Sequence, residues 1–130
     1  MKYLYPAIFE NAEEGGSIVN FPDIPNCFTC GDTMIEAMEM AQDVLAMMLA
    51  DYEDCGKEVP IPSDAKKIET KGMVNLVFAD TETWRRTVDN KAVKKTLTLP
   101  SWLNKKAEKL GINFSQTLQE ALCNKMGITL

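Results

Sequence analysis

Four short segments of the first 80 residues carry apolar side chains in the alternating or continuous patterns that β-strands show. These patterns predict strands over residues 2–10, 17–21, 27–30 and 72–80. Turn-forming residues, Asn-Ala-Glu-Glu-Gly-Gly, separate the first two strands and predict a hairpin. Because Pro6 has no backbone donor, we expect the first strand to lie toward an edge of the sheet.

The clearest helical pattern lies between the third and fourth strands. Thr33 and Glu36 form a capping box at its start, and Gly56 follows its last turn. Apolar residues recur between them at spacings of three and four, at Ala37, Met38, Ala41, Val44, Leu45, Met48, Leu49 and Tyr52. One long helix should therefore cover the sheet, which gives an α+β domain of order β-β-β-α-β over residues 1–80.

Residues 81–92 are polar and have no clear period, so we expect a linker there. Trp84, Arg85 and Arg86 form its one aromatic and cationic group. We expect this group to be solvated, although a contact with a partner or with a second chain stays open. A second module should follow over residues 93–130.

This second module has a compact plan of strand, helix, turn and helix. Residues 94–99 alternate, Pro100 fits the first turn of a short helix that stops at Gly111, and Asn113 can cap a second helix. The apolar face of the second helix consists of Phe114, Leu118, Ala121, Leu122 and Met126. A single strand and two short helices cannot bury this face alone, so the module predicts a homodimer.

Charge is distributed unevenly along the 130 residues. Residues 1–90 contain 7 lysines and arginines against 17 aspartates and glutamates, a net charge of −10. Residues 91–130 contain 7 lysines against 2 glutamates, a net charge of +5. An acidic body joined to a basic tail indicates two kinds of partner, one basic and one polyanionic.

Composition excludes several classes of site and location. The chain has no histidine, which removes the commonest general base and the mixed cysteine and histidine zinc sites. Apolar runs fall short of the roughly 18 residues of a membrane span. The first residues also become polar too early for a signal peptide, so we expect a cytoplasmic protein.

Cys27 and Cys30 form a Cys-x-x-Cys, a spacing that zinc sites and redox sites share. A structural zinc site needs four ligands, and the other two thiols, Cys55 and Cys123, come from the far end of the long helix and from the other module. A redox motif would open a helix, whereas two residues separate this one from the predicted cap. We therefore expect free thiols on opposite sides of a short strand, and no metal or cofactor.

The basic module has a pattern that suits DNA. A ribbon of two antiparallel strands fits the major groove and would present Lys94, Thr96 and Thr98 of each chain to base edges. Asn113, with the amides of Phe114 and Ser115 at the start of the second helix, could hold a backbone phosphate. The alternative is an ordinary helical hairpin with a solvated lysine face.

Two stretches of this module resemble the ribbon-helix-helix family of dimeric DNA-binding proteins. They are KKTLTLP (94–100) and GINFSQTLQEAL (111–122), with the family's spacing between them. The resemblance implies that Lys94, Thr96 and Thr98 are the base-reading residues.

The N-terminal part resembles the HicB antitoxin family in FPDIPNCFTCGDTMIEAMEMAQDVL (21–45). Asn26 replaces a glycine that is usual there, which a residue tolerant of positive φ can do. The resemblance implies a partial ribonuclease-H-like domain that neutralises a small HicA-type toxin that cleaves messenger RNA. It also implies that the C-terminal module binds operator DNA and represses the operon.

Two other functions stay open on the residues alone. One is a DNA-binding regulator that senses a small ligand through its N-terminal domain and has no toxin partner. The other is a metal-dependent nuclease that acts through Asp23, Asp32 and Glu36, although Asp32 and Glu36 already serve the predicted helix start. We expect a binding protein with two partners and no enzymatic activity.

Overall fold

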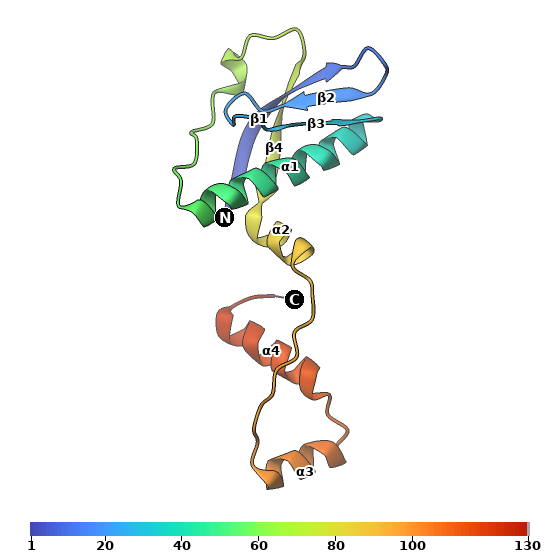
Figure 1. Cartoon of the computed structure of the whole chain (residues 1–130), viewed down its shortest axis with the longest axis vertical. Coiled ribbons are helices and arrows are strands. Elements are labelled where there is room, and N and C mark those ends of the chain that lie inside the picture. The colour runs from blue at the N-terminus through green and yellow to red at the C-terminus, as the bar shows by residue number, and fades with distance from the viewer. Residues whose placement is uncertain (130) are drawn as a thin grey trace. The chain divides into compact units, whose positions relative to one another are not determined.

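The computed structural model describes residues 1–129, which divide into two units between Lys91 and Ala92 (Figure 1). The first unit contains β1 (Lys2–Asn11), β2 (Ser17–Asn20), β3 (Phe28–Gly31), α1 (Met34–Cys55), the 3-10 turn η1 (Ala65–Lys67), β4 (Met73–Asp80) and α2 (Thr81–Val88). The second unit contains α3 (Ser101–Lys109) and α4 (Phe114–Met126). Among these residues, no helix is both long and apolar enough to cross a membrane.

The four strands form one antiparallel sheet in the order β3-β2-β1-β4. β1 and β2 make the predicted hairpin, with Ile8 opposite Asn20, and β4 runs along β1 from Lys2 opposite Asp80 to Phe9 opposite Met73. Each strand begins and ends within one residue of its prediction. The predicted α+β unit, a small sheet with one long helix, is therefore confirmed.

The prediction that Pro6 places β1 toward an edge is wrong, because β1 is an inner strand. Thr81 N donates to Met1 O over 3.0 Å, which fixes the odd-numbered residues as those that bond across the β1–β4 ladder. The nitrogen of Pro6 therefore faces the β2 side, where pairing starts only at Ile8. No strand lies opposite Pro6 on that side, so the missing backbone N–H of the proline costs no ladder hydrogen bond.

α1 lies across one face of the sheet and begins as predicted (Figure 1). Thr33 Oγ1 accepts from Glu36 N at 3.1 Å, and Glu36 Oε2 accepts from Asp32 N at 3.3 Å. Gly56 ends the helix at φ +65°. The core between helix and sheet consists of Tyr5, Ala7, Phe9, Val19, Phe21, Ile24, Cys27, Ala37, Ala41, Leu45, Ala46, Leu49, Val77 and Ala79.

The predicted linker contains a helix, α2, which packs on α1 and belongs to the first unit. Trp84 Nε1 donates to Asp43 Oδ1 over 3.1 Å, and Arg85 forms a 2.9 Å ion pair with Asp54 and donates to Ala50 O. The expectation of a solvated group is therefore wrong for Trp84 and Arg85, whereas Arg86 is exposed and pairs only with Glu82 of its own helix. The helix was not predicted because a short polar helix that is stabilised by bonds to another helix needs no repeating apolar positions in its own sequence.

The two thiols of the Cys-x-x-Cys point to opposite sides, as predicted, with Cys27 buried and Cys30 exposed. Burial raises the pKa of the Cys27 thiol to about 11. Just before it, Asn26 has φ +59°. Asparagine tolerates such a positive φ, which explains how it can replace the glycine that is usual at this position. These residues shape a turn into β3.

We expect Cys27 to resist thiol reagents in the folded protein. At pH 8 its thiol is protonated and covered, whereas Cys30 and Cys55 are exposed. Labelling with an aromatic disulfide, followed by peptide mass mapping, should modify Cys30 and Cys55 within minutes and Cys27 only after denaturation. Rapid modification of Cys27 without denaturant would contradict the burial of this turn.

Candidate functional site

α1 carries a strongly acidic surface. Its 22 residues include six carboxylates, Glu36, Glu39, Asp43, Asp51, Glu53 and Asp54, and no lysine or arginine. Large apolar side chains lie exposed on the same helix, at Ile35, Met40 and Met47. Acidic and apolar groups on one exposed helix suit a basic protein partner better than a nucleic acid.

A hollow of about 360 Å³ lies between α1, the end of β4 and the start of α2. Its walls are Glu39, Gln42, Asp43, Ala46, Phe78, Ala79, Asp80, Thr83 and Trp84, a set with three carboxylates and no cation. Asp80 caps α2. Burial acts to raise the pKa of Asp80, but hydrogen bonds from Thr83 and from the Glu82 amide outweigh it and hold this pKa below its usual range. The hollow is thus negatively charged at neutral pH.

No sequence pattern predicts this hollow directly, because the hollow depends on α2. One local signal pointed to the helix: Asp80 is a good N-cap residue, and Glu82 follows in the first turn. The contact between Trp84 and Asp43 joins residues 41 positions apart, and no pattern within a single segment records it.

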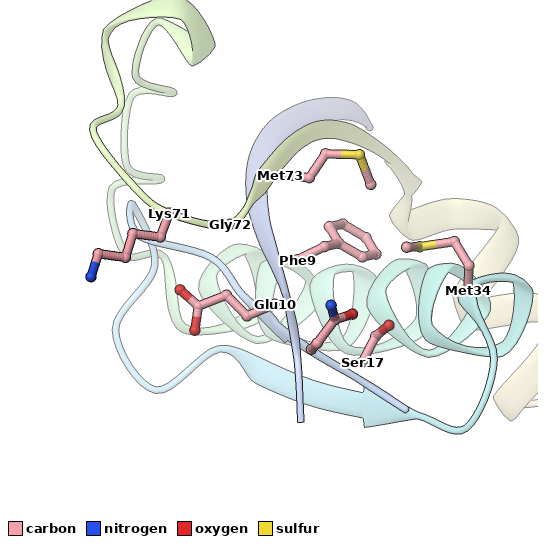
Figure 2. Close-up of a pocket in the computed structure, with 8 residues that line it drawn as sticks. Phe9, Glu10, Ser17, Met34, Lys71, Gly72 and Met73 are labelled. Carbon is pink, nitrogen blue, oxygen red and sulfur yellow. The ribbon is translucent and has the colours of Figure 1, made fainter. Parts of the chain in front are cut away.

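A larger hollow, about 570 Å³, lies where β1, β2 and β4 meet the start of α1 (Figure 2). Figure 2 shows the Phe9 ring between the side chains of Met34 and Met73, with Glu10 and Lys71 toward the other end. Of its lining residues, Ser17 is the one buried polar side chain. Small-molecule sites usually converge several polar groups on the ligand. This hollow therefore gives little support to a ligand-sensing function.

The three carboxylates considered for a nuclease serve the fold. Both oxygens of Asp23 accept from Ser63, one from its amide over 2.9 Å and one from its hydroxyl. Asp32 and Glu36 lie at the start of α1, where Glu36 binds the Asp32 amide. Among residues 1–129, no group of three or more cysteine or acidic side chains is arranged to hold a metal ion.

In the second unit, the predicted helices form where expected. Gly111 follows α3 at φ +70°, and Asn113 Oδ1 caps α4 by accepting from Gln116 N over 3.1 Å. Phe114 and Ser115 are the first residues of α4, so no intrahelical carbonyl is available to their amides. The predicted phosphate-binding group is therefore assembled around one helix N-terminus.

The segment before α3 is not part of any strand in this single chain. Residues 89–100 form neither helix nor strand, because a strand needs a second one beside it and one copy supplies none. Its alternation is nevertheless visible. Lys95, Leu97 and Leu99 line a groove of about 520 Å³ with Phe114 and other residues of α4, whereas Lys94, Thr96 and Thr98 do not line it.

The second unit exposes its apolar side chains. No residue between Ala92 and Thr129 is buried. Leu97, Leu99, Leu118 and Leu122 are between 36% and 57% exposed, although they lie on the faces predicted to be inside. A unit with this many exposed leucines lacks a core of its own.

Comparison with known families covers both units. The family described as "HicB_like antitoxin of bacterial toxin-antitoxin system" matches residues 5–123. The chain belongs to the HicB-like antitoxin family. Because this match runs from β1 into α4, the family resemblance includes the second unit.

Individual relatives of this HicB-like chain differ in how much they share. Antitoxin HicB 1 of Photorhabdus laumondii is 47% identical over 58 residues, which are 45% of this chain and 37% of that protein. The chain thus matches less than half the length of this relative. An uncharacterized 14.9 kDa protein from the rep-hol intergenic region of Haemophilus phage HP1 is 34% identical over 104 residues, 77% of this chain and 75% of the phage protein.

A solved structure is similar along nearly the whole HicB-like chain. It is a toxin-antitoxin complex from Streptococcus pneumoniae, with a TM-score of 0.61 and 29% identity. The similarity covers 96% of this chain and 99% of that one. The mixed α+β fold with a four-stranded antiparallel sheet is therefore shared with a chain from such a complex.

Proposed function

We propose that this chain is an antitoxin with two partners. Its N-terminal unit neutralises a small, basic, HicA-type toxin that cleaves messenger RNA. Its C-terminal unit forms a ribbon-helix-helix homodimer that binds operator DNA and represses the operon. The observation that carries the proposal is the family match over residues 5–123, which includes both the acidic and the basic part of the chain.

Charge supports the toxin-binding half. A protein that binds RNA needs a positive surface, and residues 1–90 have a net charge of −10, from 7 basic and 17 acidic side chains. Opposite charge raises the association rate, and an acidic protein can compete with RNA for the same surface. The acid-rich helix α1 supplies six of these carboxylates on one element.

The exposed leucines support the homodimer. Two copies of residues 94–99 could pair as antiparallel strands, so that Leu97 and Leu99 cover the α4 face that includes Leu118. The opposite side of this ribbon would carry Lys94, Thr96 and Thr98 toward base edges in the major groove. Asn113 and the amides of Phe114 and Ser115 would bind a phosphate beside it.

Co-expression with the adjacent gene tests the proposal. A stable complex with a short basic protein, measured by native mass spectrometry, is expected, together with loss of that protein's RNA-cleaving activity. Failure to co-purify, with DNA binding retained, would instead favour a regulator without a toxin. Magnesium-dependent cleavage of RNA by the chain alone, lost in Asp23→Ala, would favour the nuclease.

Thr96→Ala should weaken binding to the chain's own upstream DNA by roughly tenfold, because a direct base contact is worth about 1 to 3 kcal/mol. Binding to unrelated DNA should stay unchanged, since phosphate contacts remain. Gel-shift titrations at two salt concentrations measure the affinity for the upstream DNA and the affinity for unrelated DNA. Thr87→Ala, the same change in α2 of the other unit, is the control, and equal losses in the two variants would contradict a base-reading role.

A further inference from the structure

β4 leaves one edge of the sheet without a partner strand. Odd-numbered residues of β4 bond to β1, as the bond from Thr81 N to Met1 O shows, so the amides and carbonyls of Val74, Leu76 and Phe78 point away from the sheet. Among the described residues, no hydrogen bond beyond the ladders engages these six groups. They form a ready template for one more strand.

Between Met73 and Ala79 this edge strand has no charged residue and no proline, although the 3-10 turn η1 packs against part of β4. Its sequence, Met-Val-Asn-Leu-Val-Phe-Ala-Asp, has no lysine, arginine or proline, and its register with β1 is continuous over eight pairs, without a bulge. Leu76 and Phe78 are 53% and 48% exposed on the sheet face opposite α1. Long apolar edges of this kind are normally charged, kinked or covered in monomeric proteins.

The acidic hollow lies beside this edge. Phe78, Ala79 and Asp80 line it together with α1 and α2, and no β1 residue does, so it is on the free side of β4. Glu39 and Asp43 contribute charge, and the Trp84 ring lies with them, bonded through Nε1 to Asp43. Carboxylates beside aromatic rings suit a guanidinium or ammonium group.

A second copy of the chain fits this edge poorly. Two antiparallel β4 strands would be related by a two-fold axis perpendicular to the sheet, which places both α1 helices on the same face. Each α1 has six carboxylates and no cation, so the two acidic hollows would approach each other across the axis. Like charges brought together in this way oppose the pairing.

We propose that the free edge of β4 is where the toxin docks, through an extended segment of the toxin that adds a fifth strand to the sheet. Main-chain bonds to Val74, Leu76 and Phe78 supply affinity, and a lysine or arginine of the segment enters the hollow beside Glu39 and Asp43. This inference rests on the proposed antitoxin function and gives that function a specific surface.

Proline substitution tests the edge directly. Leu76→Pro removes an amide that points away from β1, so it blocks an added strand and leaves the β1–β4 ladder intact. Phe28→Pro is the matched control, because Phe28 lies on the other edge strand, β3, with its amide pointing away from β2. With the toxin encoded beside the chain as the probe, we expect the Kd to rise at least 30-fold for Leu76→Pro and less than threefold for Phe28→Pro.

Charge reversal supplies a second test that does not touch the strand. Glu39→Lys should raise the same Kd at least tenfold, because it places a cation in the hollow. Asp51→Lys makes an equal change on α1 outside the hollow and should alter the Kd less than threefold. Circular dichroism and thermal melts of all four variants would show that the fold persists.

The outcomes separate this inference from the proposed function. If the unmodified chain does not bind the toxin, the antitoxin function is wrong. If it binds and neither Leu76→Pro nor Glu39→Lys weakens binding, the edge is not the docking site. A Leu76→Pro variant that keeps its toxin affinity but forms smaller oligomers would assign the edge to a second copy and overturn the inference.

Discussion

Replacing Leu118 with aspartate should leave the chain monomeric and weaken its DNA binding by on the order of 100-fold or more. Leu118 lies on the α4 face that lines the groove with Leu97 and Leu99. In the proposed dimer this face is buried, and a carboxylate there would lose its water without gaining a partner. In the single chain the residue is already 36% exposed, so the helix itself tolerates the change.

Light scattering during gel filtration measures the first effect, and gel shifts with upstream DNA measure the second. Asn124→Asp adds the same charge to α4 outside the groove and should preserve the dimer. Toxin binding should persist in both variants, since the first unit is unchanged. A dimer that survives Leu118→Asp would place the self-association elsewhere in the chain.

Elements whose signals are local could be predicted from the sequence. The capping box at Thr33 and Glu36, the glycine at position 56 and the apolar period between them are properties of consecutive residues, and they define α1 correctly. The same holds for the Asn113 cap of α4. Each of these features acts within one or two turns of helix, where sequence distance and spatial distance agree.

Elements that depend on distant contacts could not be predicted in this way. α2 is polar along its length, and its bonds to α1 through Trp84 and Arg85 join residues 31 to 41 positions apart. The inner position of β1 was missed for a related reason: Pro6 is tolerated because β2 ends before reaching it. Both the contacts of α2 and the inner position of β1 arise only when the sheet and helices have assembled.

The candidate DNA-binding residues show a third situation. The alternation of Lys94, Thr96 and Thr98 with inward residues is a local property, and the groove lining agrees with it. Pairing of this segment into a ribbon requires a second chain. These site residues therefore remain predictions, whereas their placement on one side of the segment is already visible in the fold.

Gly31→Ala should destabilise the first unit by about 3 kcal/mol or more. Gly31 ends β3 directly beneath the start of α1. An added methyl group would lie 2.7 Å from Ala37 Cα and 2.9 Å from the carbonyl carbon of Glu36, and it would also collide with the Ala37 amide nitrogen. All three atoms belong to the helix backbone, which cannot rotate aside as a flexible side chain could.

The clash cannot be relieved cheaply on either side. Moving α1 would strain its first turn, where Ala37 N donates to Thr33 O over 2.9 Å. Moving β3 would strain its pairing with β2, in which Gly31 lies opposite Ser17. Since 1 kcal/mol shifts the melting temperature of a domain of this size by about 4 to 8 °C, we expect a decrease of at least about 12 °C.

Two neighbouring variants distinguish this clash from other effects of losing a glycine or changing the turn. Gly15→Ala acts at φ +97°, with no atom within 4 Å of the added methyl, and should cost only about 1 kcal/mol from backbone strain. Cys30→Ala, at an exposed position of the same strand, should be nearly neutral. If Gly31→Ala melts like Cys30→Ala, the close approach of β3 to α1 is wrong. If Gly31→Ala melts as expected, position 31 requires a glycine, because only a residue without a side chain lets β3 pass this close to the capped start of α1.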